Sequence, residues 1–467
     1  MNRQKGKMTT GVPIAIAIVI AIVVGSATAS AQHDPRVEPA PTYVIQGATI
    51  HTLAGAPIEK GSVVVSGRVI VEVGANVAVP AGASVIDAAG LNVYPGMVDA
   101  YSRLGLTEIG SVAVTSDASD LGNWNPHLRA YDAIYPASEH IPVARANGVT
   151  HALSAPGGGG GFRGGGSAGI AGQAALIHLD GYTVEDMAIN PSFGMIISWP
   201  TIQTRSFDFA TFQRIERPYN EAKREYDERI QELESWFQAA QHYKQAVENG
   251  DPTNFDRDLQ LEQLARTIGG ELPVIVSTND KRGIESAVEF AERYDLRLIL
   301  ARARDARKVK DVLAEKGIPV ILGPTQSLPA NEDDPYHYPF SLAGELYEAG
   351  VKICFGTFNS SASRTLPYEA ANAVPFGLPY EEALRAVTIN TAEIFRLADR
   401  LGTIETGKLG NLMITDGDPL EYQTQVEYVF INGIPVDTDN RHRRLWEYYK
   451  ARPQPETPTA TARRNGG

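Results

Sequence analysis

Hydrophobic and polar positions follow two different rhythms along the chain. Near residue 43, and again after residue 402, short β-branched runs are separated by Gly, Pro or polar residues about every ten residues. This spacing is typical of a small antiparallel sheet, and Ser66-Gly67-Arg68 suits a hairpin turn. We predict β-structure at 43–45, 62–73, 411–415 and 426–433.

Between these regions the rhythm changes to βα repeats. Apolar runs of about five residues alternate with amphipathic segments of about ten residues, which predicts βα units around a parallel sheet. The apolar runs show little polar alternation, so we expect both faces of this sheet to be covered. The predicted strands are 272–276, 296–300, 318–322 and 351–355, and the predicted helices are 282–294, 306–316, 341–349, 380–388 and 391–398.

A glycine-rich segment interrupts the pattern. Ten glycines lie in the 16 residues from Gly157 to Gly172. Their backbone amides are able to hold an anion or cover a ligand, which makes Gly157, Gly161 and Arg163 candidate contacts. The alternative, which we favour, is a flexible connection at the end of a strand. No Gly-Lys-Ser/Thr sequence is present, so a P-loop is excluded.

A second interruption, Pro218–Val247, has a strongly helical pattern. Its apolar residues recur at spacings of three, four and seven, which places them on one stripe of a helix. We expect this helical insertion, 210–250, to pack on the core, and an oligomer interface is the alternative. The stripe consists of Tyr226, Ile230, Leu233, Phe237, Ala240 and Val247.

Charge and composition narrow the class of protein. The 467 residues include 42 Lys and Arg against 55 Asp and Glu, a net charge of −13, so nucleic acid is not expected as a partner. The single cysteine, Cys354, excludes an intrachain disulfide framework and a Cys-rich zinc knuckle. The hydrophobic fraction of 43% and the charged fraction of 21% exclude a wholly disordered or coiled-coil chain.

The N-terminus has the pattern of a secretory signal peptide, residues 1–31. Arg3, Lys5 and Lys7 precede the apolar run Val12–Val24, and Ala29-Ser30-Ala31 provides an A-x-A cleavage site. The apolar run is shorter than the roughly 20 residues that span a bilayer, although an uncleaved anchor is the alternative. We expect export across the inner membrane to the periplasm, with no stable membrane anchor after cleavage.

The most specific patterns resemble those of a known family. The run 91–100, Leu-Asn-Val-Tyr-Pro-Gly-Met-Val-Asp-Ala, resembles the entry into the first barrel strand of the amidohydrolase superfamily, imidazolonepropionase-like branch. The C-terminal runs 382–394, 401–408 and 416–420 agree with the same family in order and spacing. The similarity extends over about 43–435, nearly the whole chain after the signal peptide.

The resemblance implies an α/β fold, a distorted (β/α)8 TIM barrel with a small β-sandwich domain formed by the N- and C-terminal segments. The barrel would comprise 94–402, the composite β-sandwich would comprise 43–93 and 403–436, and 451–467 would be a disordered tail. The family hydrolyses carbon–nitrogen, non-peptide bonds of small amides and cyclic substrates. Its metal, usually zinc, is held by an H-x-H pair and two later histidines, and an Asp transfers the proton.

This sequence departs from the family at each of those positions. Tyr101 and Arg103 stand in place of the H-x-H pair, and Ser277 and Arg302 stand in place of the later histidines. Phe358 replaces the catalytic Asp. A protonated guanidinium repels a dication and Phe cannot accept a proton, so we predict no metal here, although zinc is expected for the family. These side chains would instead form a mixed apolar and cationic pocket that suits a carboxylate or another anion.

Other histidines offer an alternative metal site. His127, His140, His151 and His178 all fall in the early barrel region, and a relocated site formed by them is the alternative to the scattered, structural histidines that we favour. We expect Asp99, Asp117, Asp120 and Asp132 to be turn and cap residues.

Two hypotheses therefore remain. The first is an exported hydrolase of the family that works with a remodelled or metal-independent site. The second is a non-catalytic member that binds a small, anionic molecule, or that pairs with a catalytically complete amidohydrolase chain as a subunit. Because a fold does not settle a function, the site has to decide, and the substitutions favour the second hypothesis.

Overall fold

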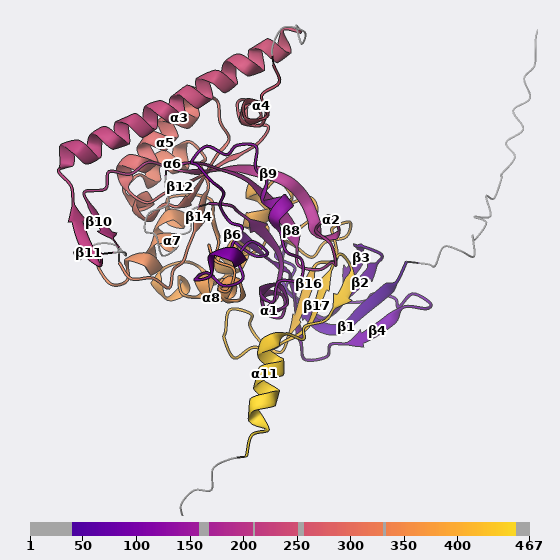
Figure 1. Ribbon diagram of the computed structural model, residues 1–467. Helices are drawn as coiled ribbons and strands as arrows, with labels where there is room; N and C mark the ends of the chain where they lie inside the picture. The colour runs from indigo at the N-terminus through magenta and orange to yellow at the C-terminus, as the bar shows by residue number, and fades with distance from the viewer. Residues whose placement is uncertain (1–39, 158–167, 209–210, 251–255, 330–332, 454–467) are drawn as a thin grey trace, which may run out of the picture. The chain divides into compact units, whose positions relative to one another are not determined.

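A computed structural model describes residues 40–157, 168–208, 211–250, 256–329 and 333–453. The predicted signal peptide, the candidates Gly161 and Arg163, and most of the predicted tail lie outside these residues. All elements from Pro41 onward belong to one compact unit (Figure 1). No helix within the described residues is long and apolar enough to cross a membrane.

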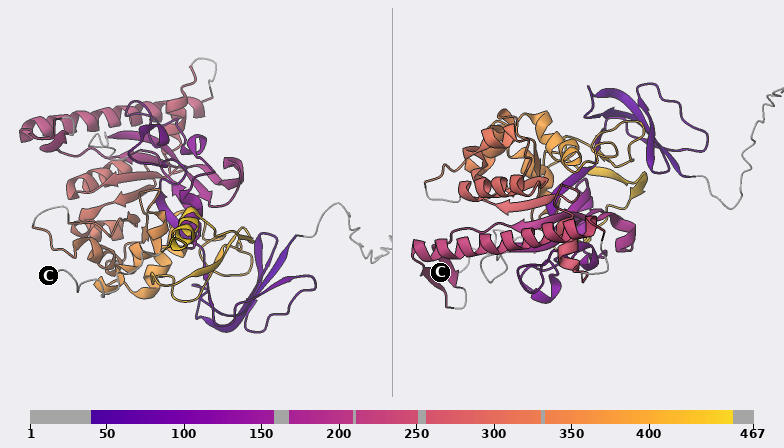
Figure 2. Two further views of the ribbon diagram at one scale, coloured as in Figure 1. Left: turned by 60° about the horizontal axis from the view of Figure 1, so that its bottom comes forward. Right: turned by 90° about the horizontal axis from the view of Figure 1, so that it is seen from above.

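The two ends of the chain share one sheet of eight strands. The N-terminal segment contributes β1 (Thr42–Ile50), β2 (Ile58–Ser66), β3 (Val69–Gly74), β4 (Ser84–Asp87) and β5 (Asn92–Pro95), and the C-terminal segment contributes β16 (Leu412–Thr415), β17 (Val426–Ile431) and β18 (Ile434–Val436). The segments meet where β16 pairs antiparallel with β5, and Figure 2 shows the C-terminal strands beside the N-terminal ones. The predicted hairpin at Ser66-Gly67-Arg68 joins β2 to β3.

Gly96 alone separates this sheet from the barrel. Its N–H donates to the carbonyl oxygen of Asn411 at 2.9 Å, which holds β5 against the C-terminal segment. A Cβ at position 96 would lie 2.3 Å from Oγ1 of Thr150, so only glycine fits. The junction therefore fixes where the first barrel strand starts.

A second sheet of eight strands forms a nearly closed barrel. In sheet order its strands are β15 (Ile353–Phe355), β14 (Val320–Leu322), β13 (Leu298–Arg302), β12 (Val274–Thr278), β9 (Ala188–Ser198), β8 (Gly169–His178), β7 (Val149–Ser154) and β6 (Met97–Ser102). The N–H of Phe358 donates to the carbonyl oxygen of Tyr101 at 2.7 Å, so the chain after β15 reaches the end of β6. This architecture confirms the predicted α/β class with a barrel and a separate sheet.

One strand runs against the others. β8 pairs antiparallel with both β7 and β9, whereas the remaining neighbours in the barrel pair in parallel. The parallel pairing predicted for 272–355 is confirmed, whereas β8 departs from the (β/α)8 pattern that the resemblance implies. Gly169 and Gly172 lie in β8 and not in a loop. The sequence did not predict this strand because the many glycines of the segment obscured the apolar run that follows them.

Helices cover the outside of the barrel. They are α5 (Lys281–Arg293), α6 (Lys310–Glu315), α7 (Tyr338–Glu348), α8 (Leu366–Ala371), α9 (Tyr380–Ala386) and α10 (Ile389–Ile394), with short helices α1 (His140–Arg145) and α2 (Val184–Met187) near β7 and β8. The 3-10 turns are η1 (Ala113–Thr115), η2 (Ala130–Ala133), η3 (Arg304–Lys308), η4 (Ser363–Thr365) and η5 (Val374–Phe376). The sequence placed β12 and β13 two residues too early, because the apolar runs begin in the turns before them.

The helical insertion lies against α5. A hairpin of β10 (Arg205–Asp208) and β11 (Gln213–Glu216) precedes the long helix α3 (Tyr219–Glu248), and α4 (Leu259–Ala265) follows it (Figure 1). Phe237 of the predicted stripe is fully buried and packs edge-to-face on Phe290 of α5, with ring centroids 4.9 Å apart. Val247 departs from the stripe and is 53% exposed, since it lies near the end of α3.

Candidate functional site

The carboxyl ends of four barrel strands bring together the positions singled out from the sequence. Tyr101 and Ser277 lie in β6 and β12, Arg302 ends β13, and Phe358 follows β15. The rings of Tyr101 and Phe358 stack with centroids 4.5 Å apart, and the guanidinium of Arg302 lies 4.4 Å from the centroid of Phe358. We call this group of side chains, together with Arg103, the barrel mouth.

Arg103 connects the mouth to the glycine-rich segment. Its Nη2 donates to the carbonyl oxygen of Gly157, and Gly157 in turn donates its N–H to the carbonyl oxygen of Ala118. The Nε of Arg103 is buried and has no hydrogen-bond partner within the described residues. Gly157, one of the three predicted loop contacts, therefore touches the mouth through Arg103.

The two arginines of the mouth carry positive charge without compensation. Burial lowers the pKa of both Arg103 and Arg302, and each is also affected by the neighbouring Tyr101. Neither arginine forms an ion pair with a carboxylate in the part of the chain that the structure describes. Arginine remains protonated even so, and the mouth is consequently a cationic site.

Tyr101 lies between these cations but stays neutral. The pKa of the Tyr101 phenol is lowered by the charges of Arg103 and Arg302 and by a hydrogen bond with Ser277. Burial outweighs them and raises the pKa of Tyr101. The phenol is therefore a hydrogen-bond donor at neutral pH and not a base.

The backbone at the mouth is strained. Arg302, Ala303 and Phe358 have φ values of 70°, 40° and 55°, in the left-handed region that side chains with a Cβ rarely adopt. The N–H of Ala303 donates to the carbonyl oxygen of Thr278 at 2.8 Å, which holds the end of β13 in this conformation. Strain of this kind clusters at functional sites, where the surrounding structure enforces it.

Asp99 lies beneath the mouth. The prediction that it is a turn or cap residue is wrong. It is in the middle of β6 and has no exposed surface. Its carboxylate accepts hydrogen bonds from the N–H of Thr357 at 3.0 Å, the hydroxyl of Thr357 at 2.6 Å and the hydroxyl of Ser363 at 3.0 Å. Burial raises the pKa of Asp99 to about 7, and these hydrogen bonds only partly oppose it. A carboxylate inside an apolar strand was the sequence signal for this buried position.

The histidines do not converge on the mouth. His151 and His178 face each other across β7 and β8, and burial lowers the pKa of His151 to about 3. Nε2 of His140 contacts the carbonyl oxygen of Glu108 at 2.8 Å, in the segment after β6. No group of three or more His, Cys, Asp or Glu side chains among the described residues is arranged to hold a metal ion. The relocated metal site thus has no support within those residues.

Comparisons with known proteins agree with the barrel. The family model described as "Amidohydrolase family" matches residues 340–437. A protein named amidohydrolase tasK, from Hapsidospora irregularis, is 24% identical over 77% of this chain, and the match spans 38% of that protein. The imidazolonepropionase of Bacteroides fragilis is 29% identical over 27% of this chain and 29% of its own length. An amidohydrolase structure from Thermotoga maritima superimposes with a TM-score of 0.73 at 25% identity, covering 85% of this chain and all of that one.

These matches support the amidohydrolase superfamily for this chain. The similarity to imidazolonepropionases supports the imidazolonepropionase-like branch of that superfamily. The sequence matches to the curated relatives cover only 19–38% of the length of each relative. The shared feature is the fold, and the activity of this amidohydrolase-like chain is decided at its own mouth.

The mouth of this amidohydrolase-like barrel does not fit the divalent metal that the superfamily uses. The oxygen donors there are the neutral hydroxyls of Tyr101 and Ser277, and the remaining positions hold two guanidinium groups and a phenyl ring. Divalent metals bind carboxylate, imidazole and thiolate ligands, and the nearby cations oppose them. We derive no step of a reaction through a metal at this site.

Proposed function

We propose that this protein is a non-catalytic member of the amidohydrolase superfamily that binds a small anionic molecule at the barrel mouth. The observation that carries the proposal is the pair Arg103 and Arg302, which are largely buried and lack a carboxylate partner among the described residues. Leaving a charge buried without a partner is costly, whereas a ligand carboxylate would compensate it. Arginine is also the side chain best shaped for bidentate binding of carboxylate.

The groups beside the mouth do not suit activation of water. A hydrolase needs a base with a pKa near the working pH and with access to the attacking water. The pKa of Tyr101 is raised by burial, so its phenol holds its proton. Asp99 has a pKa of about 7 but no exposed surface, and its oxygens already accept hydrogen bonds from Thr357 and Ser363. These facts favour binding over hydrolysis.

Titration calorimetry of the full chain with benzoate, acetate, inorganic phosphate and neutral acetamide tests the proposal. We expect the anions to bind and acetamide not to bind. Arg103→Gln and Arg302→Gln should each weaken anion binding about 10- to 100-fold, because each removes a charge-assisted hydrogen bond. Arg224→Gln is the matched control, since Arg224 lies in an exposed ion pair on α3.

Two results would overturn the proposal. One is anion affinity that is unchanged in both mouth variants, and the other is the absence of anion binding to the wild-type chain. Turnover of amides, lactams or dipeptides by the wild-type chain would restore the hydrolase hypothesis, in which carbon–nitrogen bonds are cleaved by a remodelled site.

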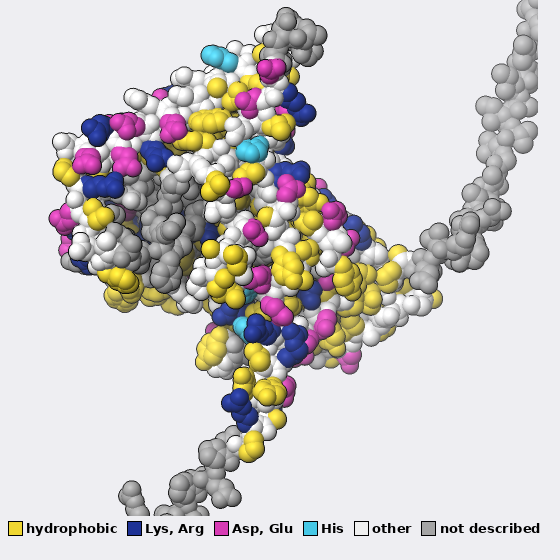
Figure 3. Space-filling model, viewed as in Figure 1, with side chains coloured by type: hydrophobic (Ala, Val, Ile, Leu, Met, Phe, Trp, Pro, Cys, Tyr) yellow, Lys and Arg dark blue, Asp and Glu magenta, His cyan; other side chains and the backbone are white. Residues whose placement is uncertain are grey.

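Pairing with a catalytically complete amidohydrolase chain is a second candidate, and α11 (Arg441–Lys450) favours it. This helix has no buried residue, and Figure 3 shows hydrophobic and basic side chains on it. Trp446 and Tyr448 are 58% and 68% exposed, and aromatic and Arg side chains are enriched in protein interfaces. The helix is basic in a chain of net charge −13, so an acidic surface of a similar chain would complement it.

Co-expression with a relative that retains the H-x-H pair tests this candidate. We expect the two chains to co-elute in size-exclusion chromatography, and Trp446→Ser to separate them. Tyr182→Ser is the control, because Tyr182 is 97% exposed but lies far along the chain from α11. Separate elution of the two wild-type chains at micromolar concentration would exclude the pairing.

We also propose export to the periplasm, on the basis of the signal-peptide pattern of residues 1–31. Fractionation of cells that express the full chain tests it. Mature protein that starts after Ala31 in the periplasmic fraction is the expected result. A full-length chain retained in the cytoplasm, or fixed in the membrane, would contradict the proposal.

A further inference from the structure

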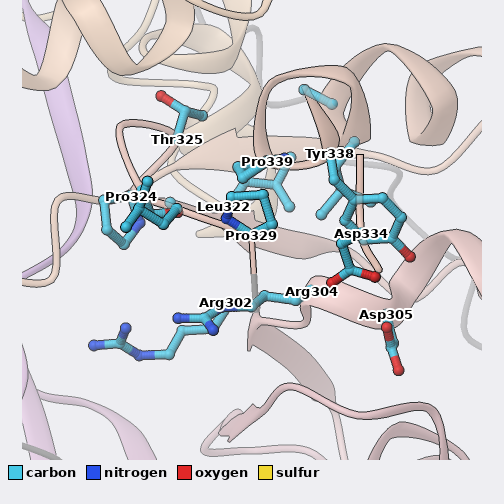
Figure 4. A pocket seen from close by; sticks show the side chains of 15 residues that line it. Arg302, Arg304, Asp305, Leu322, Pro324, Thr325, Pro329, Asp334, Tyr338 and Pro339 are labelled. Atoms are coloured by element: carbon cyan, nitrogen blue, oxygen red, sulfur yellow. The ribbon is translucent and has the colours of Figure 1, made fainter. Parts of the chain in front are cut away.

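A pocket adjoins the mouth at the ends of two strands. It lies between the carboxyl ends of β13 and β14 and the start of α7, and Arg302 and Arg304 line one side of it (Figure 4). None of its lining residues except Arg302 follows from the family's ligand pattern. The pocket is therefore a feature that only the tertiary structure shows.

The pocket is continuous with the mouth. Gly323 lines the pocket, and a Cβ at that position would lie 3.6 Å from Cε2 of Phe358. The guanidinium of Arg302 lies over the same Phe358 ring and also borders the pocket. A ligand whose anionic group contacts Arg302 is thus able to extend into the pocket.

The wall opposite the arginines is apolar. Leu322 at the end of β14, Pro324, and Leu342 and Ala343 on α7 line it. Tyr338 completes the wall, and its ring is held by the guanidinium of Arg307, 3.4 Å from the ring centroid. An apolar group in the pocket would be removed from water at a surface that is already ordered.

The far end of the pocket is acidic. Asp305 and Asp334 line it, and Asp305 accepts a hydrogen bond from the N–H of Lys281 and pairs with Lys308 at 2.9 Å. Figure 4 shows Asp305 and Asp334 on the side of the pocket away from the guanidinium groups of Arg302 and Arg304. A second anionic group on the ligand would meet these carboxylates, and because Lys308 already pairs with Asp305, we expect it to gain less there than at Arg302.

We infer that the ligand is a monocarboxylate with an apolar body, its carboxylate on Arg302 and its body against Leu322, Leu342 and Ala343. The inference rests on the proposed function, because it assigns the chemical class of the anion that the mouth binds. It adds two requirements that the mouth alone does not make. The affinity has to rise with apolar length, and a second carboxylate has to weaken binding.

Calorimetry with acetate, butyrate, hexanoate and octanoate tests the first requirement on the full chain. Burial of a methylene group is worth about 0.8 kcal/mol, so we expect the affinity to rise about fourfold per methylene until the pocket is filled. Suberate, which has a carboxylate at each end, should bind at least tenfold more weakly than octanoate. Octanol should not bind measurably.

A matched pair of substitutions on α7 isolates the pocket. Leu342→Ala removes part of the wall and should flatten the dependence on chain length. Leu346→Ala removes the same atoms from a fully buried side chain of the same helix that does not line the pocket. We expect it to lower thermal stability but to leave the chain-length dependence intact.

The outcomes separate this inference from the proposed function. Equal affinity for acetate and octanoate, with loss of both in Arg302→Gln, would overturn the pocket assignment and leave anion binding at the mouth in place. Tighter binding of suberate than of octanoate would overturn it as well. No binding of any carboxylate would overturn both.

Discussion

The guanidinium carbon of Arg302 lies 4.4 Å from the centroid of the Phe358 ring. The resemblance to the superfamily predicts a metal-binding histidine and the catalytic Asp at these two positions. The substitutions are matched to each other, because a cation over an aromatic face is stabilised whereas a cation beside a metal ion is repelled. Both residues keep a left-handed backbone, so the strand ends hold this pair in a strained geometry.

Restoring the first-strand histidines should not restore a metal site. In Tyr101→His/Arg103→His, Arg302 still places a positive charge at the mouth and Phe358 still provides no ligand. We expect no zinc binding at micromolar concentration by calorimetry or by metal analysis after dialysis.

Adding Arg302→His to that double variant provides the comparison. It supplies a third imidazole and removes the cation, so zinc should bind at least tenfold more tightly than in the double variant. Micromolar zinc affinity in the double variant alone would show that the remaining substitutions do not exclude the metal.

Asp99 should make the protein less stable as the pH rises through 7. Its pKa is raised to about 7 in the folded chain and is near 4 in the unfolded chain, so the folded state binds the proton more strongly. The free energy of unfolding therefore falls between about pH 4 and pH 7 on account of this group, and levels off above its folded pKa. The size of the change is on the order of a few kcal/mol.

Asp99→Asn isolates this effect. An amide oxygen is able to keep the hydrogen bond from the N–H of Thr357, and the hydroxyls of Thr357 and Ser363 are able to accept from the amide nitrogen, since both also donate to the carbonyl oxygen of Asn359. Urea unfolding at pH 6 and pH 8 should show a smaller decrease in the variant than in the wild type.

An exposed aspartate controls for the change of charge. Asp132→Asn, in an exposed pair with Arg129, should leave the pH dependence unchanged. The buried His151, with a pKa of about 3, lowers the free energy of unfolding as the pH falls below 6.5. The wild type and Asp99→Asn both contain His151, so its contribution cancels in the difference between them. Equal pH dependence in wild type and Asp99→Asn would contradict the assignment.

Gly356→Ala should open the seam between β15 and β6. A Cβ at position 356 would lie 2.8 Å from the backbone nitrogen of Tyr101, closer than real contacts allow. We expect the free energy of unfolding to fall by about 1–3 kcal/mol, as for other overpacked sites. Gly55→Ala, at an exposed position with no atom within 4 Å of the added carbon, should change it by less than about 0.5 kcal/mol. Equal thermal midpoints for the two variants would show that the seam tolerates the methyl group.

Removal of α11 should leave the fold intact. A chain that ends at Asn440 loses no buried side chain of the helix. It loses the exposed pairs of Arg444 with Glu139 and Asp439, the hydrogen bond from Arg443 to Thr438 and the hydrogen bonds to the Asn440 cap. Exposed pairs are worth about 0.2–1 kcal/mol each, so the thermal midpoint should shift by a few degrees at most. A large loss of stability would mean that α11 packs on the body of the protein.

The sequence by itself determined the family, the barrel and the positions of the mouth. Strand and helix periods gave β12 to β15 and their helices to within a few residues, because each element buries an apolar face of its own. The resemblance to the family singled out Tyr101, Arg103, Ser277, Arg302 and Phe358, and the structure brings them together at one mouth.

Only the tertiary structure decided what those positions do together. β8 pairs antiparallel with its neighbours β7 and β9, and the glycine-rich sequence before it carries no signal of that direction. The pocket beside Arg302 and the burial of Asp99 depend on residues from different strands, α7 and the segment after β15, which no local pattern links. Whether a charge is compensated depends on its neighbours in space. Only the tertiary structure therefore showed that Arg103 and Arg302 have no carboxylate partner among the described residues.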